Sequence, residues 1–156
     1  MLGGWRGTGV FQIHSGIPFT VTTATPSGAD ASGSGANQCG CGYSWLPNVV
    51  GSASVANPGV NEWFNPSAFA VPASGTFGNE HRNTLLGPNW RDLDLSLGKT
   101  FIFVEGMRVE IRADMFNAFN HPNFSQPNAG AGAGEAQITS TAAGARQIQL
   151  GGRFTF

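Results

Sequence analysis

Charged residues are scarce in this chain: Asp, Glu, Lys and Arg make up 11% of its 156 residues, and Lys99 is its only lysine. A typical soluble domain has roughly 25% charged residues, which keep its surface hydrated. A chain this poor in charge is therefore expected to meet something other than water over part of its surface. Because the formal net charge is −1 and Lys and Arg are not clustered, nucleic acid is not expected as a partner.

Long apolar runs are also missing. No stretch of about 18 apolar residues occurs, so the sequence predicts no transmembrane helix. Met1 and Leu2 lead directly into Gly3-Gly4-Trp5, without the basic start or the apolar segment of a signal peptide. A chain that looks exported but carries no export signal is expected to be a piece of a longer one.

Groups of residues that could bind a metal or catalyse a reaction are not found either. The two cysteines, Cys39 and Cys41, are expected to form a tight local disulfide or to remain two free thiols in an exposed loop. His14, His81 and His121 lie in three separate segments, which is not metal-ligand spacing. We therefore expect no metal and no other cofactor, and an enzyme is the least expected class.

The sequence does contain four segments in which apolar and polar residues alternate, at about 3–14, 91–103, 107–116 and 146–156. A period of two is typical of a strand with two different faces. Lys99 falls on the apolar side, where its charge is tolerable only if the ammonium group reaches a membrane interface. The third segment is the clearest, with Met107, Val109, Ile111, Ala113 and Met115 on one side and Arg108, Glu110, Arg112 and Asp114 on the other.

The connections between these segments are very unequal. A tight turn around Val104-Glu105-Gly106 joins the second and third, whereas loops 15–90 and 117–145 are long. In outer-membrane barrels the periplasmic turns are short and the extracellular loops are long. The predicted fold class is therefore all-β: an antiparallel up-and-down meander of about four transmembrane strands, forming part of an outer-membrane β-barrel with long extracellular loops.

The polar side of such a meander is expected to face the lumen, while the apolar side meets lipid. Asp92 and Asp94 share the polar side; we interpret them as lumen-facing neighbours of Arg108 or Arg112, not as an acid–base pair or a cation site. The candidate lumen-facing residues are Asp92, Asp94, Arg108, Glu110, Arg112 and Asp114.

Aromatic residues in the first long loop allow two interpretations. They could line an extracellular vestibule and contact a ligand, or they could form a small hydrophobic cluster that holds the loop together. The second is favoured, because a loop of this length without its own core would be disordered. The stretch Phe116–Phe124 allows the same two interpretations. The loop aromatics are Trp45, Trp63, Phe64, Phe69 and Phe77.

The C-terminus resembles the closing strand of Gram-negative outer-membrane proteins, which end in Phe with apolar residues at alternate positions before it. That resemblance implies a signal to the barrel-assembly machinery, although Gly152 weakens the pattern at one position. The matching residues are Ile148, Leu150, Phe154 and Phe156.

A longer series of motifs covers nearly the whole chain. It consists of Ser15-Gly16-Ile17-Pro18-Phe19-Thr20, Trp63-Phe64-Asn65-Pro66, Gly75-Thr76-Phe77-Gly78-Asn79, Leu93-Asp94-Leu95-Ser96-Leu97 with Lys99, and Arg112-Ala113-Asp114-Met115-Phe116-Asn117-Ala118-Phe119-Asn120-His121. This series is similar to the C-terminal barrel region of TonB-dependent receptors of the Oar-like type, which often carry a carboxypeptidase-regulatory-like domain.

The resemblance implies a barrel of about 22 strands with an internal plug, which takes up a ligand with energy delivered through TonB. The implied partners are outer-membrane lipid, the assembly machinery, the remaining strands and plug of the parent chain, and TonB through its N-terminal part. Residues 1–156 would then be one C-terminal fragment, not competent for transport alone. Alternatives are a self-assembling outer-membrane anchor, a passive porin-like protein and a soluble secreted β-sandwich binding module.

Overall fold

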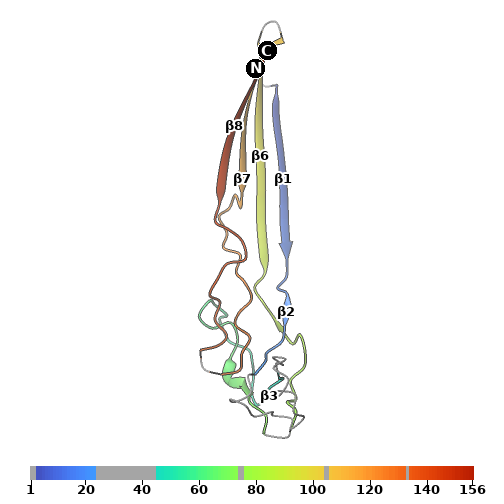
Figure 1. Cartoon of the computed structure of the whole chain (residues 1–156), viewed down its shortest axis with the longest axis vertical. Helices are drawn as coiled ribbons and strands as arrows, with labels where there is room; N and C mark the ends of the chain where they lie inside the picture. Colours follow the sequence, from blue (N-terminus) through green and yellow to red (C-terminus); the bar gives the residue numbers. More distant parts are fainter. Residues whose placement is uncertain (1–2, 24–44, 74–75, 104–105, 133) are drawn as a thin grey trace, which may run out of the picture. The chain divides into compact units, whose positions relative to one another are not determined.

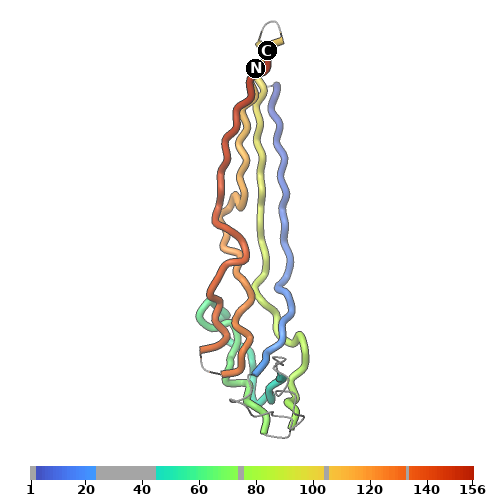
Figure 2. The backbone as a smooth tube through the Cα atoms, viewed as in Figure 1, coloured from blue at the N-terminus to red at the C-terminus, as the bar shows by residue number. Residues whose placement is uncertain are grey.

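Four long strands form one antiparallel sheet in the computed structural model, which describes residues 3–23, 45–73, 76–103, 106–132 and 134–156. The strands are β1 (Trp5–His14), β6 (Trp90–Ile102), β7 (Arg108–Phe116) and β8 (Gln147–Thr155), in the spatial order β1-β6-β7-β8. They run side by side in Figures 1 and 2. Each strand pairs with the next long strand in the sequence, so the sheet is an up-and-down meander that is not closed.

The observed bounds of these strands lie within two residues of the expected ranges. The all-β, antiparallel meander is confirmed, and the described residues include little helix apart from one 3-10 turn, η2 (Pro66–Ala68). Cys39, Cys41, Val104 and Glu105 lie outside the described residues, so the expectations for the thiols and for most of the tight turn stay predictions.

The pairing register collects apolar residues into rows that cross the sheet on one side. Directly paired residues point to the same face of an antiparallel sheet, so each row is continuous across the strands. Most of these side chains are exposed, because no second layer of described residues covers them. The rows are Gly9–Leu95–Met115–Ile148, Gly7–Leu97–Ala113–Leu150, Trp5–Lys99–Ile111–Gly152 and Phe101–Val109–Phe154.

This arrangement differs from that of a soluble β-sandwich. A sandwich requires the apolar faces of Leu93–Leu97 and Met107–Met115 to pack on each other as opposite layers. In the structure β6 and β7 are instead neighbours in one sheet, with Leu95 paired to Met115. Leu97 and Ile111 keep about half of their surface exposed, at 46% and 51%. The packing that a sandwich requires is therefore not found in the described part of the chain.

The two long connections fold together into a second compact unit, Gly16–Pro88 with Ser125–Ser140, which we call the loop unit; the remaining residues make up the sheet unit. The loop unit contains two short antiparallel pairs, β2 (Pro18–Phe19) with β5 (Leu85–Leu86) and β3 (Asn48–Val49) with β4 (Phe69–Ala70). Backbone hydrogen bonds join its two segments, including Thr22 N–H to Ala129 O and Trp63 N–H to Ala136 O, both 2.8 Å.

A small hydrophobic core stabilises the loop unit. Phe64 lies at its centre, 5.8 Å from the ring of Phe19 and 5.9 Å from the ring of Phe69, measured between centroids. Both long connections supply core residues, so neither segment is expected to hold this conformation alone. The buried members are Phe19, Val21, Phe64, Ala68, Phe69 and Ala136.

Candidate functional site

The side of the sheet opposite the apolar rows carries most of the charged residues of the strands, with Lys99 and Arg91 as exceptions. All six lumen-facing candidates belong to β6 or β7 and alternate with the apolar residues, so they share this polar side. The rows across it are Thr100–Glu110–Arg153, Arg6–Gly98–Arg112–Gly151, Thr8–Ser96–Asp114–Gln149, Val10–Asp94 and Gln12–Asp92, with Ile102–Arg108–Thr155 at the end.

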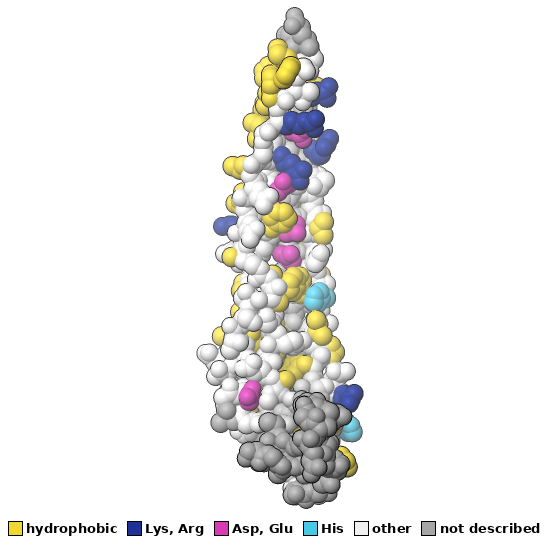
Figure 3. All heavy atoms as spheres, in the orientation of Figure 1, with side chains coloured by type: hydrophobic (Ala, Val, Ile, Leu, Met, Phe, Trp, Pro, Cys, Tyr) yellow, Lys and Arg dark blue, Asp and Glu magenta, His cyan; other side chains and the backbone are white. Residues whose placement is uncertain are grey.

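Basic and acidic residues occupy different levels of the polar side. Figure 3 shows Lys and Arg side chains gathered toward the end of the sheet where the two termini lie, with Asp and Glu farther along the strands. The basic rows contain Arg6, Arg108, Arg112 and Arg153, accompanied by Glu110. Because most of these guanidinium groups have no carboxylate within 4 Å in the described residues, this level of the polar side can attract anions.

One ion pair connects the basic and acidic levels. The Nε of Arg112 donates to Oδ1 of Asp114 at 2.8 Å, and the two residues are neighbours on the same side of β7. The Arg112 side chain keeps 59% of its surface exposed, so water competes for the interaction. A pair of this kind stabilises the fold by roughly 0–1 kcal/mol.

Asp92 and Asp94 form no ion pair with Arg108 or Arg112 among the described residues, although Asp94 and Arg112 line one pocket. Both aspartates lie on the polar side, but Arg112 pairs with Gly98 and Arg108 with Ile102, toward the other end of β6. Asp94 instead accepts a hydrogen bond from the backbone N–H of Asn117 at 3.0 Å. Strand alternation correctly predicts the face of each residue, whereas its neighbours depend on the register between strands.

Asn117, just past the end of β7, organises the loop-side end of the sheet. Its φ of 49° is the left-handed conformation that Asn adopts more readily than most residues. Its side chain donates to the carbonyls of His121 and Gly144 at 3.0 and 3.1 Å and accepts from His121 N–H at 2.9 Å. The amide of Asn117 thus stabilises the turn from Asn117 to His121. It also joins this turn, through Gly144, to the segment before β8.

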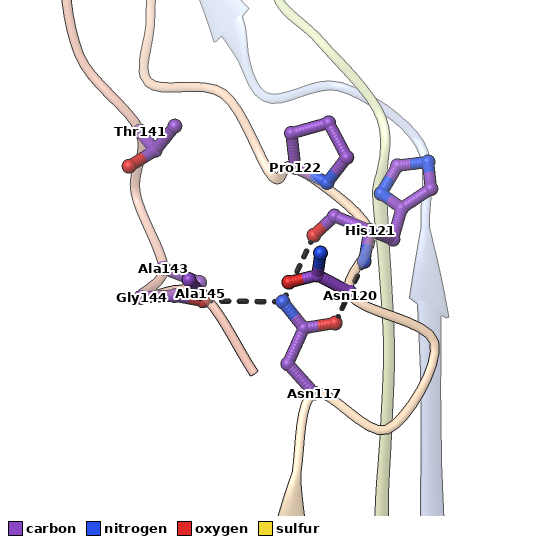
Figure 4. Close-up of a pocket in the computed structure, with 8 residues that line it drawn as sticks. All are labelled: Asn117, Asn120, His121, Pro122, Thr141, Ala143, Gly144 and Ala145. Carbon is purple, nitrogen blue, oxygen red and sulfur yellow. Dashed lines mark hydrogen bonds between the residues drawn. The ribbon is translucent and has the colours of Figure 1, made fainter. Parts of the chain in front are cut away.

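A cavity of about 340 Å³ with a mixed lining opens beside this amide (Figure 4). A second cavity of about 240 Å³ shares four of its lining residues and also includes Asp92. Nδ1 of His121 and Oδ1 of Asp92 are buried without a hydrogen-bond partner among the described residues, and buried polar atoms of this kind normally have a partner such as an ordered water. The larger cavity is lined by Asn117, Asn120, His121, Pro122, Thr141, Ala143, Gly144 and Ala145.

The histidines are not brought together. His14 stacks on Trp90, with ring centroids 5.8 Å apart and planes 7° apart, while His121 lines the cavity beside Asn117 and His81 belongs to the loop unit. No group of three or more His, Cys, Asp or Glu side chains that could hold a metal ion occurs among the described residues.

The loop aromatics divide into core and surface residues. Phe64 and Phe69 keep only 2% and 7% of their surface exposed, so they cannot line a vestibule; burial in the core of the loop unit accounts for them. Trp63 packs against that core and donates its Nε1–H to Leu86 O at 2.8 Å. Phe77, 74% exposed, lies 6.2 Å from the Trp45 ring between centroids and remains a candidate for ligand contact.

The four C-terminal residues of the assembly motif take the positions that strand alternation predicts. Ile148, Leu150 and Phe154 belong to the apolar rows of β8, and Phe156 follows the strand with its ring 5.8 Å from that of Phe154. Gly152 occupies the row of Lys99 and Ile111, where a side chain is missing. The apolar pattern is therefore interrupted at one position without changing the register.

Sequence reasoning singled out no asparagine as a functional or organising residue. Asn117 and Asn120 both have positive φ, and Asn120 accepts from Arg146 N–H at 3.1 Å. Three asparagines within seven residues, at 117, 120 and 123, would have indicated a folded turn, because Asn both tolerates this conformation and bonds nearby backbone.

An open meander with one apolar side, one charged side and long connections defines a segment of a transmembrane β-barrel wall. The chain belongs to the outer membrane beta barrel domain family, whose sequence pattern matches residues 1–149. The protein is accordingly an outer-membrane protein. No curated protein and no solved structure matches the chain. None of the helices in the described segments is long and apolar enough to cross a membrane.

Proposed function

We propose that this chain forms part of the wall and the extracellular loops of a TonB-dependent receptor that takes up a ligand across the outer membrane. Family membership supplies the barrel and its location. The receptor assignment is supported by the ordered motifs that run from Ser15 to His121. Uptake is assigned to the complete barrel, because spanning barrels have at least 8 strands and four cannot enclose a lumen.

The unequal connections between strands carry this proposal. Between β6 and β7 the chain turns directly, with Phe103 N–H donating to Met107 O at 2.8 Å. The other two connections build a unit with its own hydrophobic core. We assign the short turn and the C-terminus to the periplasm and the loop unit to the cell exterior, in keeping with other outer-membrane barrels.

Partners follow from the same assignment. The apolar rows meet outer-membrane lipid, and β1 and β8 pair with the remaining strands of the barrel, because each has one edge without a partner among the described residues. The polar side faces the plug, and the C-terminal motif engages the barrel-assembly machinery. Phe77 and the cavity beside Asn117 contact ligand. TonB is contacted by parts of the receptor other than these strands. No catalytic role is proposed.

The orientation is tested by cysteine labelling on intact cells, after Cys39 and Cys41 have been replaced by Ser. A cysteine at Phe77 is expected to react with a membrane-impermeant maleimide, whereas one at Met107, beside the short turn, reacts only after the outer membrane is permeabilised. Both side chains are exposed, Phe77 at 74% and Met107 at 37%, so burial in the protein does not prevent labelling of either position. Labelling of Met107→Cys on intact cells would contradict the proposed orientation.

Uptake through a plugged barrel is tested by liposome swelling. The protein extracted from the outer membrane is reconstituted into phosphatidylcholine vesicles, which are then diluted into isotonic arabinose. A plugged receptor is expected to give no swelling, and reversible unfolding of the plug with urea is expected to permit it. Swelling without urea would instead support the passive porin.

A fixed oligomer of 156-residue chains, measured by light scattering in detergent, would support the self-assembling anchor.

A further inference from the structure

Lys99 lies on the apolar side of the sheet near the end of β6, whereas the other basic residue on that side, Arg91, pairs with Ile13 at the start of the strand. Lys99 lies in a row with Trp5 on β1 and Ile111 on β7. Its ammonium nitrogen donates to the carbonyl oxygen of Gly3 at 2.5 Å and lies 4.9 Å from the centroid of the Trp5 ring and 5.5 Å from that of Phe101. Because Gly3 precedes β1, the side chain points toward the end of the sheet where the termini lie (Figure 1).

The charge of Lys99 is only partly compensated by the protein. An ammonium group has three N–H donors, and Gly3 accepts one of them. No carboxylate of the described residues lies within ion-pair distance of Lys99. Cation–π contacts with two rings add stabilisation but cannot replace an anion. At least one N–H group is therefore available to a partner outside the chain.

The depth of this residue in the bilayer determines what that partner is. A basic residue on the lipid side is strongly unfavourable at the midplane, and this penalty nearly disappears near an interface. Aromatic residues mark the interface level in outer-membrane barrels. Trp5 keeps 65% of its surface exposed beside Lys99, and a row with Phe101 and Phe154 follows toward the same end. Lys99 thus has lipid headgroups within reach.

We propose that Lys99 and Trp5 form a binding site for the phosphate group of a phospholipid. The ammonium group donates to the phosphate oxygens, the indole of Trp5 lies against the glycerol region, and Phe101 contacts the first acyl carbons. The site rests on the outer-membrane location of the family and is independent of ligand uptake. Its assignment to the periplasm-facing leaflet rests on the orientation proposed above, whereas lipid binding in detergent can be measured without knowing the orientation.

Native mass spectrometry of the protein extracted from the outer membrane tests this site. Phosphatidylglycerol is compared with diacylglycerol of the same acyl chains, which lacks the phosphate. Lys99→Gln is expected to weaken phosphatidylglycerol binding about fivefold, the factor that corresponds to about 1 kcal/mol for one basic residue near a lipid surface. Lys99→Arg is expected to retain binding. Arg6→Gln is the matched control, because Arg6 follows Trp5 but lies on the polar side.

A second measurement uses the unmodified protein, so it does not depend on assembly of a variant. Phosphatidylglycerol is expected to slow acetylation of Lys99 about fivefold, and diacylglycerol is expected to have no effect. Equal lipid binding by Lys99→Gln and the original protein would overturn the proposal, as would equal loss in Arg6→Gln. Displacement of the lipid by inorganic phosphate at millimolar concentration would identify a simple anion site instead and would also overturn it.

Discussion

The side chain of Asn123 pairs with the backbone of Arg91 as a neighbouring strand would. Its Oδ1 accepts from Arg91 N–H and its Nδ2 donates to Arg91 O, both at 2.9 Å, and the residue has no exposed surface. This amide therefore takes the place of a strand at the start of β6, where β1 pairs on the other side through His14 and Ile13. A single side chain thus completes the hydrogen bonding of the sheet at its loop-side end.

Replacing Asn123 by Ala is expected to destabilise the protein. The N–H and C=O groups of Arg91 would both lose their partners, and each unpaired buried group costs roughly 1–3 kcal/mol. Asn89→Ala is the control, since Asn89 is exposed and lies two residues before Arg91. The free energy of unfolding in lipid vesicles and the hydrogen-exchange rate of the Arg91 amide provide the measurement. Equal effects of the two variants would contradict the role of Asn123.

How far the sequence predicts this fold depends on the distance over which each interaction acts. Alternation is local, so each of the four strands could be predicted from its own residues, and the side on which Arg112 or Leu97 lies from residues 91–116. The partner of Asp94 could not, because it depends on the register of β6 against β7 and on the turn that follows. Asn123 is separated from Arg91 by the rest of β6 and all of β7, and no period in the sequence connects them.

The loop unit was less predictable still. Sequence reasoning favoured a hydrophobic cluster over a vestibule, and Phe64 and Phe69 are indeed buried. The pairing of the first long loop with Ala129 and Ala136 of the second was not predicted, because small residues in a low-complexity stretch carry no apolar pattern. Their small side chains allow the two segments to approach closely, a property that only the folded structure reveals.

Truncation of Phe64 is expected to unfold the loop unit while leaving the sheet intact. Phe64→Ala removes a buried ring from the small core, at a cost of about 3–5 kcal/mol. Phe77→Ala, at an exposed position, is expected to change stability by less than about 1 kcal/mol. Limited proteolysis of intact cells measures unfolding of the loop unit in each variant. Heat-modifiability in gels measures whether the strands of the sheet remain paired. Equal resistance of the two variants would show that the loops do not depend on this core.

Gly78 is required by close packing of the backbone. A Cβ atom there would overlap the carbonyl oxygens of Leu46 and Pro47, whereas one at Gly59 would meet nothing within 4 Å. Gly78→Ala is therefore expected to destabilise the loop unit by about 1–3 kcal/mol, and Gly59→Ala is expected to be neutral or slightly stabilising. Proteolysis rates of the loops compare the two directly. A neutral Gly78→Ala would mean that this approach is not maintained in the folded protein.

Phe156 is expected to affect assembly more than stability. Its ring is 96% exposed and lies 5.8 Å from the Phe154 ring between centroids, so its removal takes little packing from the sheet. Phe156→Ser is expected to reduce the amount of heat-modifiable protein in the outer membrane several-fold, with unchanged unfolding of the protein that does assemble. Thr155→Ala, at the last position of β8, serves as the control. A parallel loss in both variants would indicate a general effect of the strand end.

The sidedness of the sheet is tested most directly at mid-strand. Ala113 lies on the apolar side, in the row of Leu97 and Leu150, while Gln149 lies on the polar side opposite Asp114. Ala113→Arg is expected to cost about 2–4 kcal/mol, because it forces a cation toward hydrocarbon. Gln149→Arg adds the same charge beside a carboxylate and is expected to change stability by less than about 1 kcal/mol. Denaturant titration in lipid vesicles measures both, and comparable costs would mean that the two sides do not meet different media.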